Sequence, residues 1–425
     1  MIVEPLARST GHQTWFASKL VKALIDAGFN PTLITFDGMN DEADLEFRNN
    51  GYDVRRILPL APRWVRWAFG KLTGIAPGSM AKPSAVRWRF QIYLYNQLAT
   101  VISTIYSVRS VCSGQAAVLH LLCPPSWPTL WCFQAARRAG TTAVITTFGA
   151  PCVYRGGAAL RRRLCKSKAA TILVQTEALA SDWSRDVGSS SVRTIPMPSG
   201  DSVRPKDPQE CRRLLGLPLD KPIVAVIGCM APQKGYIELY HALRGAEKNF
   251  RILLIGDTPS WISPDPETVA EQCGWLDHTI YQNRFVTEAM WPLLLGAVNV
   301  VALLYREPNA SSGILSLCQQ YGVPVLATRF GELGTKVRSE NLGLTADPND
   351  PEEVTAALIR ILNSGDNRDA QTGGDRKHTC GGTVETDAAP SWADVASAHL
   401  RLYAALQKTT LNECNGTVSS NSRLQ

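Results

Sequence analysis

Short apolar runs alternate with amphipathic segments along most of the chain. In the first half, the runs that predict strands are MIVEPL, NPTLITFDG, AAVLHLL, TTAVITTFG and AATILVQT. The alternation restarts in the second half with KPIVAVIGCM, FRILLIGD, VNVVALLY and GVPVLATR. Near-continuous apolar strands that alternate with helices are typical of parallel sheets covered on both faces. We therefore predict an α/β protein built from parallel sheets.

A stretch rich in proline, serine and charge, VRTIPMPSGDSVRPKDPQ, separates the two series of strands. The chain has 425 residues, which exceeds the size at which one hydrophobic core usually divides. We predict an amino-terminal domain over 1–197, a linker over 198–220 and a second domain over 221–364. Two doubly wound domains of this kind carry ligands at the carboxyl ends of their strands.

The last part of the chain divides into three segments. Residues 365–390 are polar, glycine-rich and aperiodic, so we expect a disordered insertion there. Residues 391–408 predict a terminal helix, and residues 409–425 a flexible tail. The apolar face of that helix recurs at steps of three and four residues. Its members are Trp392, Val395, Ala396, His399, Leu402, Tyr403 and Leu406.

Composition narrows the classes of function. Hydrophobic residues make up 45% of the chain and charged residues 19%, as in ordinary globular proteins. The net charge of +7 allows attraction to phosphates or anionic lipids, but no zinc-finger spacing, RNP-type motif or long basic run indicates a nucleic-acid partner. The 11 cysteines are scattered singly, which favours reduced thiols and a cytoplasmic protein. No signal-peptide pattern and no membrane-spanning apolar run is present.

The first candidate site is the loop from Gly228 to Gly235, which follows the strand PIVAVIG and precedes a helix. Loops at this place in open α/β sheets meet the ligand. Lys234, at the start of that helix, is a natural partner for a diphosphate. The alternative is a solvated turn with a surface lysine.

The second candidate site is the loop before the helix ILSLCQQYG. Small residues there let backbone and hydroxyl donors approach a phosphate at the helix start, and a neighbouring guanidinium adds a fork-shaped cation. Nearby acidic and amide side chains would accept hydrogen bonds from sugar hydroxyls. The alternative is a plain strand-to-helix turn. The candidate residues are Arg306, Glu307, Asn309, Ser311, Ser312 and Gly313.

The amino-terminal half offers three weaker candidates. Gly11 allows a ligand to approach the following helix, and His12 could donate a hydrogen bond to it. His120 ends the strand AVLH, which would face the same cleft. For either histidine, the alternative is a structural role, in a turn or in the core. No cluster of histidine and acidic residues predicts a metal site, and no nucleophile motif predicts a hydrolase.

Residues 55–95 interleave cations with aromatic side chains. This composition suits an interfacial segment that rests on anionic lipid headgroups. The alternative is a helical lobe whose tryptophans pack inward while its arginines stay hydrated. The residues concerned are Arg63, Trp64, Arg66, Trp67, Lys71, Arg87, Trp88 and Arg89.

Several of these segments resemble family-4-type glycosyltransferases of the GT-B fold, in which two Rossmann-like domains face a central cleft. VIGCMAPQKG is similar to the family's strand and loop that end in the diphosphate-binding lysine, here Lys234. NRFVTEAMWPLLLGAVNVVALLYRE and GVPVLATRFGELG match the segments that follow, and ILVQTEALASDW with VRTIPMPSGDS resembles the end of the first domain and the hinge. Gly11 matches the family's amino-terminal glycine loop, and the terminal helix resembles one that crosses back to the first domain.

The chain departs from the family pattern at several positions. The family's arginine after the glycine is Cys229, and the usual pair of glutamates falls at Asn309 and Leu317. YREPNASSGILSL is similar to the motif of a subgroup that lacks the second glutamate. In that subgroup pattern, Glu307 would take over part of the role of the missing glutamates. His120 lies where the family often has a His-x-His pair, whose second histidine is Leu122 here.

The resemblance implies transfer of a sugar from a UDP- or GDP-linked donor to a hydroxyl of a glycan or lipid-linked acceptor, in glycan, glycolipid or polysaccharide biosynthesis. It also implies retention of configuration and no metal or other cofactor, with His120 and Glu307 as catalytic candidates. We expect a cytoplasmic enzyme, with peripheral contact to the inner face of the membrane through residues 55–95 as an open question. Two alternatives are a catalytically impaired GT-B protein that binds a nucleotide sugar, a glycan or a partner enzyme, and a nucleotide-sugar epimerase.

Overall fold

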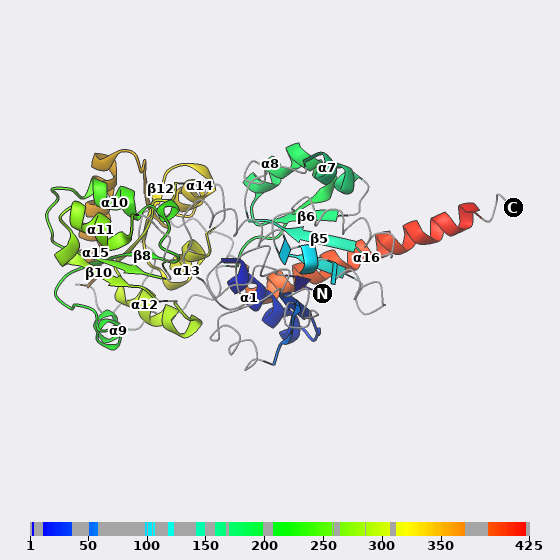
Figure 1. Ribbon diagram of the computed structural model, residues 1–425, viewed down its shortest axis with the longest axis horizontal. Helices are drawn as coiled ribbons and strands as arrows, with labels where there is room; N and C mark the ends of the chain where they lie inside the picture. The colour runs from blue at the N-terminus through cyan, green and yellow to red at the C-terminus, as the bar shows by residue number, and fades with distance from the viewer. Residues whose placement is uncertain are drawn as a thin grey trace. The chain divides into compact units, whose positions relative to one another are not determined.

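The computed structural model describes most of the chain, and its contacts divide the chain into two compact units. Unit 1 comprises Met1–Met197 and Pro390–Gln425, and unit 2 comprises Pro198–Ala389. Each unit contains one parallel sheet with helices packed against it (Figure 1). The residues described are 2–3, 12–35, 51–57, 98–99, 101–103, 105–106, 118–122, 142–148, 158–166, 170–198, 207–256, 258, 264–284, 286–306, 312–369 and 390–421.

The sheet of unit 1 has seven strands in the order β3-β2-β1-β4-β5-β6-β7, and every neighbouring pair is parallel. The elements of unit 1 are β1 (Ile2–Val3), α1 (His12–Asp26), β2 (Thr32–Thr35), β3 (Asp53–Arg56), β4 (Val118–Leu121), β5 (Thr142–Thr146), α7 (Ala158–Lys166), β6 (Ala170–Val174), α8 (Glu177–Val187), η3 (Ser189–Ser191), β7 (Val192–Thr194) and α16 (Trp392–Asn421).

The sheet of unit 2 has six parallel strands in the order β10-β9-β8-β11-β12-β13. The elements of unit 2 are α9 (Pro208–Leu215), β8 (Ile223–Ile227), η4 (Pro232–Lys234), α10 (Tyr236–Ala242), β9 (Arg251–Ile255), α11 (Pro266–Gln272), η5 (Leu276–His278), β10 (Thr279–Gln282), η6 (Glu288–Met290), α12 (Trp291–Ala297), β11 (Val300–Leu303), α13 (Gly313–Tyr321), β12 (Val325–Thr328), α14 (Gly331–Ser339), β13 (Gly343–Ala346) and α15 (Pro351–Asp369).

The predicted α/β class with parallel sheets is confirmed. All nine predicted strand segments contain a strand of one of the two sheets. The strands that the apolar pattern did not predict are β3, β7, β10 and β13, and these are the four edge strands. Edge strands are solvated on one side and tolerate polar residues, so they do not form continuous apolar runs. Their sequences, such as DVRR in β3 and TIYQ in β10, show this.

The segment 198–220, predicted as a linker, contains a well-formed helix, so that prediction is wrong for its second half. Asp207 caps the first turn of α9 by accepting a hydrogen bond from the Glu210 backbone N–H, and Gly216 ends the helix in the left-handed conformation. The guanidinium of Arg212 donates to the Ala297 carbonyl at 2.9 Å and to the Asn299 side chain at 2.7 Å. These bonds fix α9 within unit 2.

The helices near the carboxyl terminus extend further than the sequence pattern predicts. Helix α15 continues to Asp369, and α16 continues to Asn421 rather than ending at 408. Residues 370–389, most of the predicted disordered insertion, lie outside the described residues. Within the described part of the chain, no helix combines the length and apolar character needed to cross a membrane.

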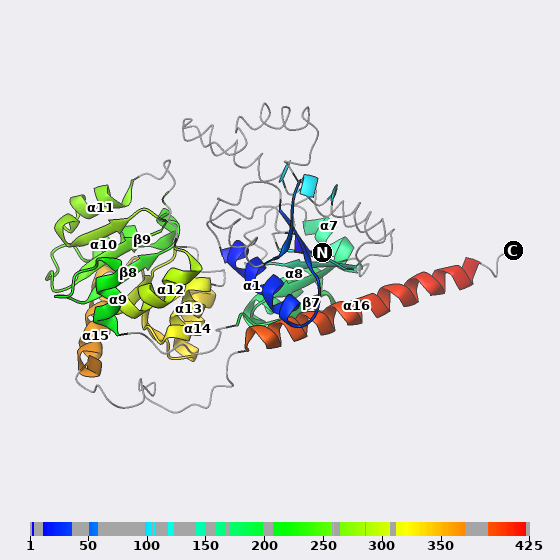
Figure 2. The same cartoon turned by 90° about the horizontal axis from the view of Figure 1, so that it is seen from below.

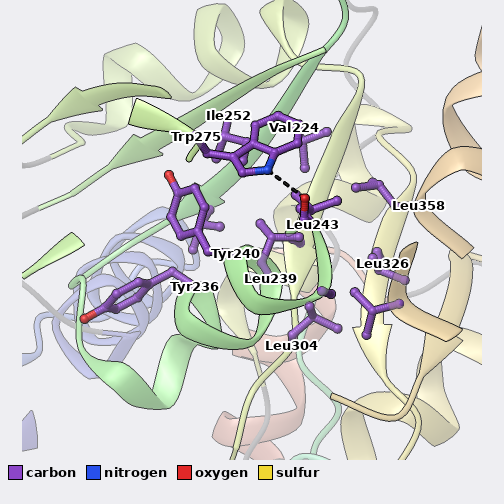
Figure 3. Close-up of a cluster of buried hydrophobic side chains, with 14 of the residues drawn as sticks. Val224, Tyr236, Leu239, Tyr240, Leu243, Ile252, Trp275, Leu304, Leu326 and Leu358 are labelled. Carbon is purple, nitrogen blue, oxygen red and sulfur yellow. Dashed lines mark hydrogen bonds between the residues drawn. The ribbon is translucent and has the colours of Figure 1, made fainter. Parts of the chain in front are cut away.

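The core of unit 2 fixes helix α10 against the sheet. Trp275 stacks on Phe250 with ring centroids 5.0 Å apart. The indole N–H of Trp275 donates to the Leu243 carbonyl at 2.8 Å (Figure 3). Tyr236 and Tyr240 fill the same cluster from α10. Helices α10, α11 and α15 cover this face of the sheet, while α9 and α12 pack on the other (Figure 1). Because α10 is held along its length, the turn before it has a fixed position at the end of β8.

Helix α16 packs into unit 1 beside α1 and β5 (Figure 2) and completes a buried cluster of polar rings. His120 on β4 lies 2.6 Å from the Thr146 hydroxyl through Nε2 and 2.6 Å from the Tyr403 hydroxyl through Nδ1. His399 stacks on His120 with ring centroids 5.6 Å apart, and its Nδ1 lies 2.7 Å from the Val395 carbonyl. A carbonyl only accepts, so His399 Nδ1 carries a hydrogen. Two neutral imidazoles therefore join the helix to the sheet.

The histidine pair predicts a stability that decreases in mild acid. Burial lowers the pKa of His399 to about 4, and burial together with His399 lowers the pKa of His120 well below the ordinary value. In the unfolded chain both histidines have a pKa of about 6.5. Between that pH and about 4, the unfolded state therefore binds more protons than the folded state does. The free energy of unfolding should therefore fall as the pH decreases through this window, by roughly 3 kcal/mol from His399 alone. Chemical unfolding at a series of pH values measures this slope.

Because carboxylates also contribute to acid unfolding, His399→Gln is the matched comparison. This variant carries no titrating group at position 399, so its unfolding free energy should depend less steeply on pH than that of the parent. Equal slopes in parent and variant would contradict the assignment.

Candidate functional site

The strand order of unit 2 reverses between β8 and β11, which makes this the topological switch point of the sheet. The chain leaves β8 toward β9 on one side, and it leaves β11 toward β12 on the other. At such a switch point the loops after the two strands diverge, and ligands bind outside the carboxyl ends of the strands. The loops concerned are residues 228–235 after β8 and residues 304–312 after β11.

The loop after β8 starts with tightly packed glycines. The Gly228 N–H donates to the Ile255 carbonyl at 3.0 Å, with φ of 114° at Gly228. A Cβ on Gly256 would lie 1.8 Å from the Gly228 carbonyl oxygen, so only glycine fits there. A Cβ on Gly228 itself would lie 3.8 Å from Lys234 Nζ. The ammonium therefore lies directly over bare backbone.

Two further contacts join the loop after β8 to the loop after β11. Gly235 has φ of 78°, and a Cβ on it would lie 1.9 Å from the Leu304 carbonyl oxygen. The Arg306 N–H donates to the Gln233 carbonyl at 3.1 Å. The two loops are thus held together by backbone contacts, which fixes where their side chains meet.

Lys234 extends across this junction to Tyr305. Its Nζ donates to the Tyr305 hydroxyl at 3.2 Å and lies 4.4 Å from the centroid of the same ring. No carboxylate among the described residues lies within ion-pair distance of this ammonium. An ammonium without a carboxylate partner, at the switch point of an α/β sheet, can bind an anionic ligand.

The same tyrosine hydroxyl lies 3.4 Å from Ser312 Oγ. Ser312 is the N-cap of α13, where its side chain accepts a hydrogen bond from the Leu315 N–H at 3.3 Å. Gly313 is the first residue of that helix. The first turn of a helix carries a partial positive charge and free N–H groups, which favour a phosphate. Lys234 and the start of α13 therefore converge on one place.

Arg306 is oriented differently from Lys234. Its Nε donates to the carboxylate of Glu238 on α10, and its side chain is 50% exposed while that of Glu238 is 9% exposed. The other carboxylate oxygen of Glu238 is buried without a hydrogen-bond partner. The Arg306 charge is therefore balanced within the protein, in contrast to that of Lys234.

The structure does not test the placement of the remaining predicted site residues at this switch point. Gly11, Glu307, Asn309 and Ser311 lie outside the described residues, and His12 begins α1 without a described side chain. Residues 58–95, most of the basic and aromatic segment, are also outside. No group of histidine, cysteine and acidic side chains within the described parts of the chain could hold a metal ion.

His120 lies inside unit 1 and not at a surface. Both of its ring nitrogens have protein partners, and 1% of the residue is exposed. This geometry matches the alternative of a core histidine, which the sequence left open. Its proposed catalytic role stays a prediction.

Tyr305 is a site residue that sequence reasoning did not select. It stands at the end of the apolar run VNVVALLY, where an aromatic residue is naturally assigned to the core. The available signal was its position after a strand and before the small-residue loop. Only the fold shows that residue 305 reaches a lysine 71 positions earlier in the chain.

Comparisons with known proteins agree with this architecture. The family described as Glycosyl transferases group 1 matches residues 221–364. A D-inositol 3-phosphate glycosyltransferase of Corynebacterium efficiens is 33% identical over 221 residues, which cover 49% of this chain and 48% of that protein. One of Acidothermus cellulolyticus is 29% identical over 186 residues and 41% of each chain. The chain thus matches less than half the length of these curated relatives.

Solved structures extend the likeness to both units. Anabaena HepE in complex with UDP and glucose has a TM-score of 0.62 at 14% identity, covering 99% of this chain and 98% of that one. Sucrose-phosphate synthase of Thermosynechococcus elongatus has a TM-score of 0.62 at 15% identity, with coverage of 99% and 98%. The chain has the GT-B fold, in which each unit is a Rossmann-like domain, and its residues 221–364 match the model of the family Glycosyl transferases group 1.

Proposed function

We propose that this protein transfers a sugar from a nucleoside-diphosphate donor to a hydroxyl group of an acceptor. The observation that carries the proposal is the ammonium of Lys234, which has no carboxylate partner among the described residues and lies beside the first turn of α13. The group 1 match over the same residues supports it. A diphosphate is the donor group that this arrangement of charge and N–H groups suits.

In the proposed reaction the bond between the anomeric carbon and the diphosphate oxygen breaks, and a bond from the acceptor oxygen to that carbon forms. The acceptor hydroxyl attacks from the face that the diphosphate leaves, and it gives its proton to an oxygen of that leaving diphosphate. Attack from the same face retains the configuration at the anomeric carbon. Negative charge grows on the leaving group, and Lys234 with the N–H groups at Ser312 and Gly313 stabilises it. This stabilisation uses protein groups alone, and metal independence is part of the proposal.

We infer a UDP- or GDP-linked donor and an acceptor that is a glycan or a lipid-linked molecule. The fold likeness to a structure solved with UDP and glucose supports a nucleotide-sugar donor. The name of the sequence relatives, D-inositol 3-phosphate glycosyltransferase, supports transfer to a hydroxyl group. Such enzymes serve glycan, glycolipid or polysaccharide biosynthesis.

The second candidate function is a catalytically impaired protein that binds a nucleotide sugar, a glycan or a partner enzyme. One observation favours it: Leu317, where the family has its second glutamate, is a buried apolar residue of α13. Incubation with nucleotide sugars separates the two functions. An enzyme slowly transfers the sugar to water and so releases nucleoside diphosphate, whereas a pure binder releases none.

Replacing the proposed diphosphate ligand provides the main test of activity. Lys234→Ala should lower kcat/KM for sugar transfer by about 30- to 1,000-fold, since loss of one charge-stabilising donor costs about 2–4 kcal/mol of transition-state stabilisation. Lys248→Ala, at an exposed lysine in the turn before β9, is the matched control and should retain parent kinetics. Parent activity in Lys234→Ala would remove the assigned role.

Ligand binding can be tested without knowing the acceptor. A nucleotide sugar that binds only the folded state raises the thermal unfolding midpoint by mass action. We expect UDP- or GDP-linked sugars to raise the midpoint of the parent and to leave that of Lys234→Ala nearly unchanged. Equal shifts in both proteins would place the binding site elsewhere.

Membrane contact through residues 55–95 is a separate part of the proposal. The test is flotation with vesicles of neutral lipid, with and without anionic lipid. We expect the protein to float only with anionic vesicles, and less so at high salt, because surface attraction to lipid headgroups is screened. Recovery of all the protein in the unbound fraction would contradict membrane contact.

A further inference from the structure

We propose that Tyr305 is a positioning residue that holds the Lys234 ammonium and orients the Ser312 hydroxyl toward the donor diphosphate. The inference rests on the proposed function and adds to it a residue that acts through two others. Its basis is the chain of side-chain contacts from Lys234 Nζ to the Tyr305 hydroxyl and on to Ser312 Oγ.

Tyr305 contacts the ammonium in two ways at once. The hydroxyl accepts a hydrogen bond from Nζ at 3.2 Å, and the ring lies 4.4 Å from the same nitrogen. A free lysine side chain has many rotamers, and their restriction costs conformational entropy. A lysine that is already held in place loses less of this entropy when the ligand binds.

This way of holding the ammonium leaves its charge available. A ring face and a phenol attract a cation through a quadrupole and a dipole, and they do not neutralise it. The neighbouring Arg306 shows the contrast, because the carboxylate of Glu238 balances its charge. A diphosphate therefore meets an oriented ammonium that no carboxylate of the described residues neutralises.

The position of Tyr305 is itself fixed by the backbone on both sides. Leu304 is fully buried, and its carbonyl lies in the space that a side chain at Gly235 would need. The following residue, Arg306, donates its N–H to the Gln233 carbonyl. The phenol thus extends from a rigid junction of the two loops.

An ammonium only donates, so the Tyr305 oxygen accepts from Lys234. Either hydroxyl can donate across the 3.4 Å contact between Tyr305 and Ser312, and the proposal assigns the hydrogen to the phenol. Ser312 Oγ also accepts from the Leu315 N–H, which occupies its second lone pair. The hydrogen of the Ser312 hydroxyl is therefore left to donate to a ligand oxygen. Tyr305 sets this direction without touching the ligand.

Two substitutions separate the hydroxyl from the ring. Tyr305→Phe keeps the ring over Lys234 but removes both hydroxyl contacts, and it should weaken UDP or GDP binding by about 3- to 10-fold. Tyr305→Leu also removes the ring, and it should weaken binding by about 10- to 100-fold. Tyr321→Phe, at the other end of α13, is the matched control and should bind as the parent does. Calorimetric titration with UDP and GDP measures all four proteins.

Three readouts distinguish positioning from a structural role. The loss should be larger for UDP or GDP than for the corresponding nucleoside, and Tyr305→Phe should keep the parent unfolding midpoint without ligand. In the Lys234→Ala background, Tyr305→Phe should add less than its own single effect, because the ammonium that it positions is gone. Two results would overturn the inference and leave the proposed function intact. One is parent affinity in Tyr305→Leu, and the other is a fold-loss of affinity from Tyr305→Phe that is as large in the Lys234→Ala background as in the parent. A parent protein that binds neither nucleotide would overturn both.

Discussion

The proposed site depends on one interaction, the placement of the Lys234 ammonium over the Tyr305 ring at the switch point of a parallel sheet. Pairing a cation with a carboxylate is the simpler way to fix it, and Arg306 is fixed in that way by Glu238. Lys234 is instead held by neutral groups, and no carboxylate among the described residues pairs with it. Close packing at Gly235 makes this possible, because it brings the two loops within side-chain reach.

The fold could be predicted from the sequence wherever burial dictates composition. Central strands such as β8 and β11 are buried on both faces and consist of apolar residues, so their sequences alone identify them. The edge strands carry polar residues and were missed for the same physical reason. Helix α9 was missed because its proline-rich and charged surroundings are typical of a linker, although Asp207 and Gly216 supply complete capping signals.

The site could be predicted only in part. The pattern of small residues and a lysine after strands identified Gly228, Lys234 and Ser312, and the fold brings these together. The partner of Lys234 could not be read from the sequence, because the contact with Tyr305 joins residues far apart in the chain. A sequence also cannot tell a buried histidine from an exposed one, and His120 with its stacked partner His399 joins α16 to the sheet.

The most direct test of the central claim is a crystal structure of the protein grown with an excess of UDP or GDP. The account predicts that a phosphate oxygen lies within about 3 Å of Lys234 Nζ and accepts hydrogen bonds from the first turn of α13. Two results would contradict the proposed role of Lys234. The phosphates of a bound nucleotide could lie away from Lys234 and Ser312, or no nucleotide could be bound at a saturating concentration.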